Sequence, residues 1–194
     1  MRGFPISRIL LFARAFFRLA LAKRRGWRTV SVEHLFSGSA VDAVGFDGAV
    51  RLPPFILRVV EGGAGLGRMM VGAHESHPCL TAWEPRRAPV LQAEVERQRL
   101  RDEANGVPVA EHHQRARRVF GFVEDAIIEG GRITIPAMLR RKAGIGDRVL
   151  FVGTGSGFEI WNPDLARRAG DPALREIAEY RLGINEDMEE GEAK

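Results

Sequence analysis

Gly131-Arg-Ile-Thr-Ile-Pro136 decides the fold of this chain, because Gly48-Ala-Val-Arg-Leu-Pro53 repeats its pattern 83 residues earlier. Both stretches read as a glycine turn, a short strand with alternating apolar residues, and a proline that suits the first turn of a helix. Further along, Leu80-Thr-Ala-Trp83 parallels Phe158-Glu-Ile-Trp161 at an offset of 78 residues. We infer that the chain contains a tandem duplication.

Each copy predicts the same short elements. In the first copy we expect strands over 50–52, 68–71 and 79–83 and a helix over 54–61; in the second we expect strands over 118–123, 133–135, 148–152 and 158–161 and a helix that Gly144 ends. A unit of about 45 residues is near the limit for burying a core alone, and its short strands leave edges that need pairing. We therefore predict a mainly β fold with short helices, in which the two copies interlock around a pseudo-two-fold axis as one small barrel. Flanking helices are expected over 89–104 and 164–182.

The composition is that of a soluble globular protein, since 45% of the 194 residues are apolar and 28% are charged. The single cysteine, Cys79, rules out an intrachain disulfide framework and fits a reducing cytoplasm. No apolar run approaches the roughly 20 residues needed to cross a bilayer. Residues 1–30 hold eight basic side chains and no acid, whereas residues 31–194 hold 21 basic and 25 acidic groups. The net positive charge of the chain therefore comes from the leading segment. It does not indicate that the folded body binds nucleic acid.

These features predict five segments. They are a basic amphipathic N-terminal extension (1–30), a first repeat unit (33–85), a helix and linker (86–108), a second repeat unit (114–163), and a C-terminal helix with an acidic tail (164–194). In the extension, Arg14 and Arg18 share one face of a helix whose remaining circumference is apolar. That pattern fits a membrane-surface helix or a secretory signal. We favour instead an appendage that is non-native or disordered.

Four motifs carry a resemblance to a known family. They are Gly131-Arg-Ile-Thr-Ile-Pro136, Arg140-Arg-Lys-Ala-Gly144, Phe158-Glu-Ile-Trp161 and His77-Pro-Cys-Leu80. From about residue 31 to residue 182 the sequence resembles the MraZ family. The resemblance implies two AbrB/SpoVT-like units that form a swapped-hairpin barrel. It also implies a cytoplasmic, nucleoid-associated DNA-binding repressor of the division and cell-wall gene cluster, which acts as a homo-oligomeric ring on short direct repeats.

The family pattern also points to candidate DNA contacts, because it has an Asp four residues before an Arg at the glycine turn of each unit. Here Arg132 keeps the arginine, whereas Ile128 and Gly45 stand at the Asp positions and Ala49 stands at the first Arg position. An arginine that projects from such a turn can reach phosphates or base edges with its planar fork. We expect Arg132 to contact double-stranded DNA, and the further candidates are Arg51, Arg58, Arg140 and Arg141. The alternatives are a surface ion pair for Arg132 and a solvated helix face for the Arg140–Arg141 pair.

Other constellations give weaker signals. His74-Glu-Ser-His77-Pro-Cys79 has metal-ligating residue types, but no second cluster completes a four-ligand zinc site. The run Gly62-Gly-Ala-Gly-Leu-Gly67 reads as a flexible turn, and the matched positions of Trp83 and Trp161 favour core packing over base stacking. No catalytic frame is recognisable in the sequence, so we expect neither an enzyme nor a bound cofactor or metal.

A protein-interaction module is the competing class of function. AbrB-like units also serve as antitoxins that hold a partner through a flexible tail, and the acidic end from Glu186 to Glu192 could be such a tail. The repressor interpretation instead requires DNA and other copies of the chain as partners. It predicts no membrane partner for the folded body.

Overall fold

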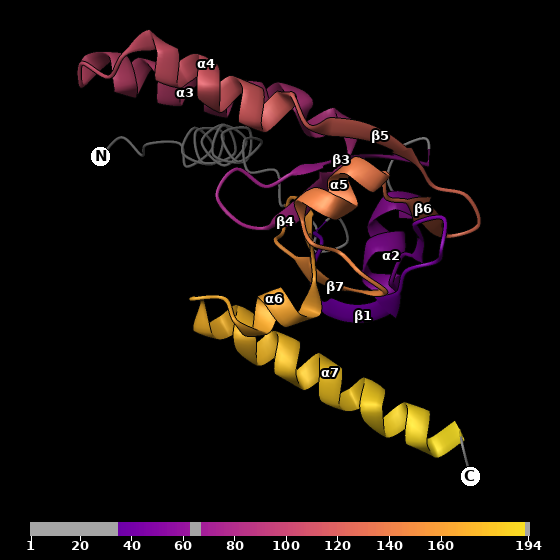
Figure 1. The fold of residues 1–194 in the computed structure, drawn as a ribbon. Coiled ribbons are helices and arrows are strands. Elements are labelled where there is room, and N and C mark those ends of the chain that lie inside the picture. The colour runs from indigo at the N-terminus through magenta and orange to yellow at the C-terminus, as the bar shows by residue number, and fades with distance from the viewer. Residues whose placement is uncertain (1–34, 63–66, 193–194) are drawn as a thin grey trace, which may run out of the picture. The chain divides into compact units, whose positions relative to one another are not determined.

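A computed structural model describes residues 35–62 and 67–192 of the chain, with the backbone alone for residues 184–192 (Figure 1). The chain divides into two units, Met1–Val32 and Glu33–Lys194, and the second contains every described residue. The expected N-terminal extension and most of the glycine-rich turn at 62–67 therefore fall outside the described residues. None of the described helices combines the length and the hydrophobicity that crossing a membrane requires.

The two repeats contain the same elements in the same order. The first repeat consists of β1 (Ser39–Ala43), β2 (Ala49–Arg51), α2 (Pro54–Gly62), β3 (Arg68–Ala73) and β4 (Cys79–Trp83). The second repeat consists of β5 (Val123–Ile127), β6 (Arg132–Thr134), α5 (Ala137–Lys142), β7 (Arg148–Gly153) and β8 (Phe158–Trp161). In both repeats a proline leads from the short strand into the helix, because proline cannot donate to a strand ladder but fits the start of a helix.

One predicted strand is wrong. The sequence pattern favoured a strand over 118–123, but the helix α4 (Val109–Phe120) covers its first half and β5 begins only at Val123. The Gly121 N–H donates to the Arg117 carbonyl at 2.8 Å, so helical hydrogen bonding continues to residue 121. The apolar residues at the end of this helix are spaced as in a strand, which is why the sequence pattern favoured the wrong element.

Strands are exchanged between the two repeats. The larger sheet has the order β1-β7-β8-β4-β3-β5, and all its neighbouring strands are antiparallel. Hence β1 of the first repeat pairs with β7 of the second, and β5 of the second pairs with β3 of the first. Numbered by their place within a repeat, the six strands follow one another as first, third, fourth, fourth, third and first. The order is therefore palindromic. Each repeat therefore relies on the other to cover the edge of its third strand.

In the middle of each sheet, equivalent residues of the two repeats lie opposite each other. In the pair β4–β8, Thr81 lies opposite Glu159, and these residues correspond at the repeat offset of 78. In the small sheet formed by β2 and β6, Val50 lies opposite Ile133, and these correspond at the offset of 83. The strand pairing thus follows the pseudo-two-fold relation that the duplication predicts.

The hydrogen-bonded strands do not close into a barrel in the described part of the chain. β1 and β5 are the outer strands of the six-stranded sheet, and β2 and β6 form a separate sheet. Isolated bridges at the turns, such as Val44 opposite Val50, link the two sheets. The ladder of β2 and β6 is only three residues long, and single bridges, not continuous ladders, connect it to the segments that follow β1 and β5. The prediction of strands with short helices is confirmed, whereas a closed barrel is not what these strands form.

Both repeats contribute to the main core. Its buried side chains include Val50, Ile56, Ile133, Leu139, Phe151 and Phe158. Burying an apolar side chain of this size contributes roughly 1.5–3 kcal/mol. Trp83 and Trp161 are also buried, with 7% and 3% of their surface exposed. They are therefore core residues, as their matched positions predict.

A pair of helices follows the first repeat and extends outward from one side of the sheet. The short 3₁₀ turn η2 (Pro85–Arg87) leads into α3 (Ala88–Ala104), which lies beside α4 (Figure 1). Arg115 of α4 forms an ion pair with Asp102 of α3 and joins the two helices. The helix expected over 89–104 is confirmed, but α4 was not predicted.

Two further helices lie against the other half of the sheet (Figure 1). These are α6 (Pro163–Arg167), which contacts β7, and α7 (Pro172–Glu192), which contacts β1. The single helix expected over 164–182 is divided at 168–171, because Pro172 suits a helix start better than a helix interior. The acidic tail continues α7 as far as Glu192, and its side chains lie outside the described ones.

Candidate nucleic-acid interface

The Gly131 corner, residues 129–132, is a tight hairpin turn that leads into β6. Glu129 and Arg132 exchange two backbone hydrogen bonds of 3.0 Å around Gly130 and Gly131. The two glycines have φ angles of +56° and +74°. Two left-handed residues in succession are what a type I′ hairpin turn requires, and glycine adopts them without strain. The corner therefore presents Arg132 from a short turn of defined geometry.

The Gly48 corner, residues 45–49, leads into β2 and is one residue longer. The Gly45 N–H donates to the Ala49 carbonyl at 2.7 Å, and the Gly48 N–H donates to the Gly45 carbonyl at 2.8 Å. Gly48 has a φ of +88°, so residues 46–48 form a three-residue hairpin loop that ends in a left-handed glycine. The Asp47 carboxylate accepts the Ala49 N–H at 2.9 Å. An aspartate within the loop thus supports this corner, although Gly45 stands at the family's Asp position.

Arg51 and Arg132 lie directly opposite each other in the small sheet. The Leu52 N–H donates to the Gly131 carbonyl at 2.9 Å, which makes the arginines a non-hydrogen-bonded pair. In such a pair the Cα atoms are about 4.5 Å apart and both side chains leave on the same face. Both side chains are exposed, and neither forms an ion pair with any side chain that the structure describes. The surface ion pair considered for Arg132 is therefore not found among those residues.

Glu129 is the acidic side chain of the Gly131 corner. It lies opposite Arg132 across the turn, so the two side chains leave on the same face. Glu129 is exposed and forms no ion pair with another described side chain. This end of the small sheet thus combines the guanidinium groups of Arg51 and Arg132 with one carboxylate, which leaves a local positive charge.

Arg140 brings a guanidinium group to the opposite end of the small sheet, where Ala49 pairs with Thr134. A Cβ built on Gly48 would lie 2.9 Å from both Cζ and Nε of Arg140, so this α5 side chain lies directly against the Gly48 corner. Its Nε is buried and has no hydrogen-bond partner among the described residues. Leu57, the equivalent residue of α2, lies against Gly131 in the same way. Arg140 thus supplies the charge that Ala49 cannot.

Arg58 and Arg141 are equivalent residues of α2 and α5 at the offset of 83. Both are exposed, and neither takes part in an ion pair among the described side chains. They belong to the helices and not to the small sheet or its corners. The structure therefore brings three of the five predicted arginines to the small sheet and leaves these two on the adjoining helices.

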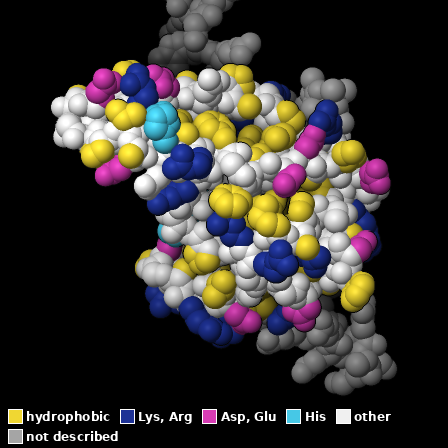
Figure 2. Space-filling model, turned by 45° about the horizontal axis from the view of Figure 1, so that its top comes forward, with side chains coloured by type: hydrophobic (Ala, Val, Ile, Leu, Met, Phe, Trp, Pro, Cys, Tyr) yellow, Lys and Arg dark blue, Asp and Glu magenta, His cyan; other side chains and the backbone are white. Residues whose placement is uncertain are grey.

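Basic side chains do not form one continuous patch on the face in Figure 2. The Lys and Arg side chains stand there in separate groups, with hydrophobic and acidic side chains between them. Carboxylates neutralise several arginines of the helical pair, since Arg99 contacts Glu96 at 2.7 Å and Glu103 at 2.8 Å. The arginines of the small sheet are thus not clustered more closely than those of the helical pair. They differ because no described acidic side chain pairs with them.

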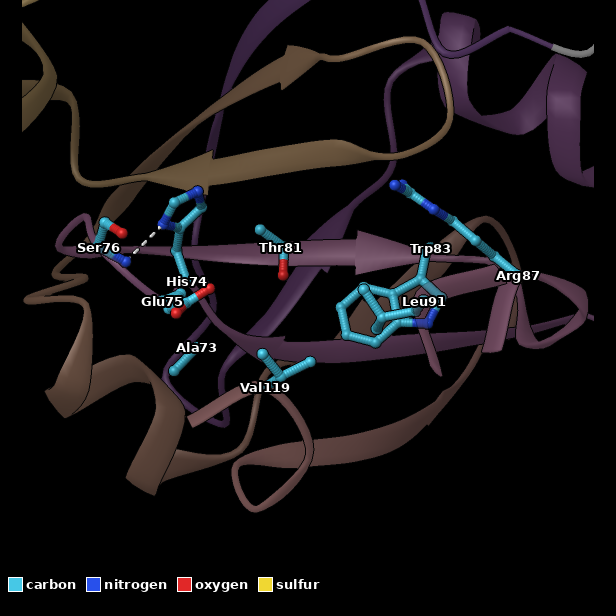
Figure 3. Close-up of a pocket in the computed structure, with 9 residues that line it drawn as sticks. All are labelled: Ala73, His74, Glu75, Ser76, Thr81, Trp83, Arg87, Leu91 and Val119. Atoms are coloured by element: carbon cyan, nitrogen blue, oxygen red, sulfur yellow. Dashed lines mark hydrogen bonds between the residues drawn. The ribbon is translucent and has the colours of Figure 1, made fainter. Parts of the chain in front are cut away.

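A separate cavity of about 220 Å³ lies between the larger sheet and the helices α3 and α4 (Figure 3). At its polar end, His74 Nδ1 accepts the N–H groups of Ser76 and His77 at 3.0 and 3.1 Å. Burial lowers the pKa of His74, and the nearby Glu159 carboxylate opposes that shift. No group of three or more His, Cys, Asp or Glu side chains in the described part of the chain is arranged to hold a metal ion. His74 is instead engaged in holding the turn before β4.

Phe46 is the residue at these corners that the sequence analysis missed. Its side chain is fully exposed, at 106% of the reference surface, on the loop of the Gly48 corner. The spacing of the two copies contained a signal for an unusual loop here. The offset between the copies is 84 residues from β1 to β5 but 83 from β2 to β6, so the first corner, which contains Phe46, has one extra residue.

The geometry defines a class of protein in which two homologous β units exchange strands around a small sheet that carries exposed arginines at its turns. A family model described as "MraZ protein, putative antitoxin-like" matches residues 129–165, from the Gly131 corner into α6. Over that region, and at lower identity over most of its length, the chain is similar to the MraZ family.

Three relatives show how far the likeness extends. The transcriptional regulator MraZ of Gluconacetobacter diazotrophicus is 28% identical over 138 residues, which cover 69% of this chain and 82% of that protein. The transcriptional regulator MraZ of Oenococcus oeni is 35% identical over 69 residues, 34% of this chain and 48% of the relative. The transcriptional regulator MraZ of Rickettsia bellii is 48% identical over 46 residues, which cover 23% of this chain and 31% of that protein. For the last two, the match spans less than half of the relative.

Proposed function

We propose that this protein is a sequence-specific DNA-binding transcriptional repressor whose small sheet meets double-stranded DNA. The similar proteins are named transcriptional regulators, which supports the class of function. The proposed targets are the genes of the division and cell-wall cluster, and the proposed place of action is the nucleoid in the cytoplasm. The proposal includes no catalytic step.

The observation that carries the proposal is the placement of Arg51 opposite Arg132. Like charges directly opposite in an antiparallel pair are destabilising, so this arrangement costs free energy until an anion shares it. A DNA phosphate can accept charge-assisted hydrogen bonds from both planar forks, and either fork can also address a guanine edge. A phosphate-bearing ligand therefore fits this end of the sheet.

Both ends of the small sheet can reach the same stretch of DNA. Ala49 and Arg132 lie at levels two residues apart along the paired strands, which corresponds to about 7 Å. Arg140 lies against Gly48, next to the first level, and the Arg51–Arg132 pair lies at the second, so we expect these groups to contact neighbouring phosphates of one duplex. This spacing supports a single interface made by both repeats.

Several copies of the chain would strengthen such a small contact. Residues 31–194 hold 21 basic and 25 acidic groups, so net charge contributes little attraction to DNA. We propose a homo-oligomeric ring that repeats the corners at fixed spacing along short direct repeats. Each further contact is then intramolecular, and the affinity rises by multivalency.

Binding to DNA from upstream of the protein's own gene tests this function. Full-length protein is titrated into a labelled duplex of that region and into a scrambled duplex of the same composition, at several salt concentrations. We expect tighter binding of the natural duplex and an affinity that falls steeply with salt. Equal binding of the two duplexes, or no binding, would refute the repressor proposal.

An antitoxin-type interaction module is a second candidate, because the matching family model carries the description antitoxin-like. In that case the natural duplex would not be preferred, and the protein would form a stoichiometric complex with a second protein through its acidic tail. Deleting residues 186–192 separates the two functions. The deletion should abolish the protein complex in the second case and leave DNA affinity unchanged in the first.

A further inference from the structure

The Gly48 corner contains an aromatic side chain that folding leaves without cover. Phe46 has the highest exposure of the large hydrophobic residues in the described part of the chain. Phe120 and Phe122 are 43% and 37% exposed, and the Lys142 ammonium lies 4.2 Å from the ring centre of Phe122. Phe46 therefore contributes nothing to the core and places its whole ring at the surface.

Phe46 is displayed by a defined turn. Three short hydrogen bonds close the loop, two between backbone groups of residues 45–49 and one from the Ala49 N–H to the Asp47 carboxylate. Arg140 lies against Gly48 on the same corner. A side chain held in this way loses little further conformational freedom when it binds a partner.

The charge at this corner differs from that at the Gly131 corner. Ala49 stands where Arg132 stands in the second repeat, so the charged groups of this corner are the Asp47 carboxylate and the Arg140 guanidinium. Arg140 is therefore the one cation of this corner that can hold a phosphate, whereas the apolar ring has no charge to satisfy. The first corner thus combines a single phosphate contact with a side chain suited to contact with bases.

We propose that Phe46 is an apolar wedge that enters the DNA at a base step and kinks the duplex. This inference rests on the proposed function, because it assigns the first corner a role at the same DNA interface. Proteins that bend DNA insert apolar side chains such as Phe between base pairs, and neighbouring arginines hold the adjacent phosphates. Phe46 and Arg140 both belong to the Gly48 corner and provide this combination, because Arg140 lies against Gly48, two residues from Phe46 in the same loop.

The test compares Phe46→Ala and Phe46→Leu with the wild-type protein on its natural duplex. We expect Phe46→Ala to lower the affinity by about tenfold without changing the slope of affinity against salt, because no phosphate contact is lost. Energy transfer between dyes at the two DNA ends should report a smaller bend. Phe46→Leu should keep most of the bend, because an aliphatic wedge also separates base pairs. Phe120→Ala on α4 is the matched control and should alter neither quantity.

The outcomes separate this inference from the proposed function. If the wild-type protein binds no DNA specifically, the proposed function fails and the inference fails with it. If it binds and Phe46→Ala binds and bends DNA equally well, the inference alone is overturned. A changed salt slope, or a changed subunit number in sedimentation with unchanged DNA affinity, would also overturn it, because Phe46 would then act on charges or between protein chains.

Discussion

Arg51 and Arg132 come from different repeats, 81 positions apart in the chain, and face each other across the small sheet. Their side chains leave the same face of a non-hydrogen-bonded pair, and no described acidic side chain pairs with either. The pair exists only because the two repeats exchange strands. Because two like charges directly opposite each other cost free energy that an anion would relieve, we propose this pair as a contact for a DNA phosphate.

Replacing Arg51 or Arg132 by alanine should weaken binding to the natural duplex by about tenfold, because each variant loses one charge-assisted contact. The slope of log affinity against log salt should fall by about one in each case. Anisotropy titrations at several salt concentrations measure both effects. If the two arginines share one phosphate, the double variant should lose less than the sum of the single losses.

Arg99→Ala is the control for these variants, because Glu96 and Glu103 already neutralise that guanidinium on α3. It should leave the affinity and the salt slope unchanged. An Arg132→Ala variant with the wild-type affinity and slope would show that this side chain does not contact DNA.

Replacing Glu129 by glutamine should strengthen DNA binding. The change removes the carboxylate beside Arg132 and keeps the size of the side chain, so repulsion of the phosphates falls. At about 0.1 M salt we expect a gain of roughly threefold, as for one partly screened charge. Glu124→Gln on β5 is the matched control. Weaker binding by the Glu129 variant would mean that this carboxylate positions Arg132.

Replacing Gly48 by alanine should lower the free energy of unfolding. Its φ of +88° disfavours any other residue, and a Cβ there would lie 2.8 Å from the Ile135 carbonyl oxygen. We expect a loss of about 2–3 kcal/mol in urea denaturation. Gly146→Ala, where a Cβ meets no atom within 4 Å, should change stability by about 0.5 kcal/mol or less. A stable Gly48 variant would show that the corner can rearrange.

Stability should fall on acidification through the titration of His74. Burial lowers the pKa of His74 below its ordinary value of 6.5, so near this pH the unfolded chain binds a proton that the folded protein resists. The free energy of unfolding is therefore not reduced by His74 above pH 6.5, and it decreases as the pH falls below that value. His74→Asn keeps a side-chain acceptor for the two turn N–H groups, and its free energy of unfolding should depend less on pH between about 7.5 and 5.5. His113→Asn on the exposed face of α4 is the control, and an unchanged pH dependence in the His74 variant would refute the assignment.

The repeat in the sequence was enough to predict most of the strands, the two helices that follow the prolines and the burial of both tryptophans. These features depend on local pattern, since strand alternation, glycine turns and proline positions are set by a few neighbouring residues. Where local pattern was ambiguous the prediction failed. Val119 and Phe120 fit a strand as well as a helix end, and the periodic apolar residues of 164–182 hid the break that Pro172 introduces between α6 and α7.

The sequence also indicated the five arginines, but not their arrangement. Arg51 meets Arg132, and Arg140 reaches Gly48, only through contacts between residues more than 80 positions apart. Such contacts depend on strand register, and a shift of one residue would turn each side chain to the other face. The inventory of elements thus follows from short-range sequence pattern, whereas the pairing of charges at the small sheet follows from the exchange of strands. The reason is that each short repeat has edges and apolar surface that it can cover only with the other repeat.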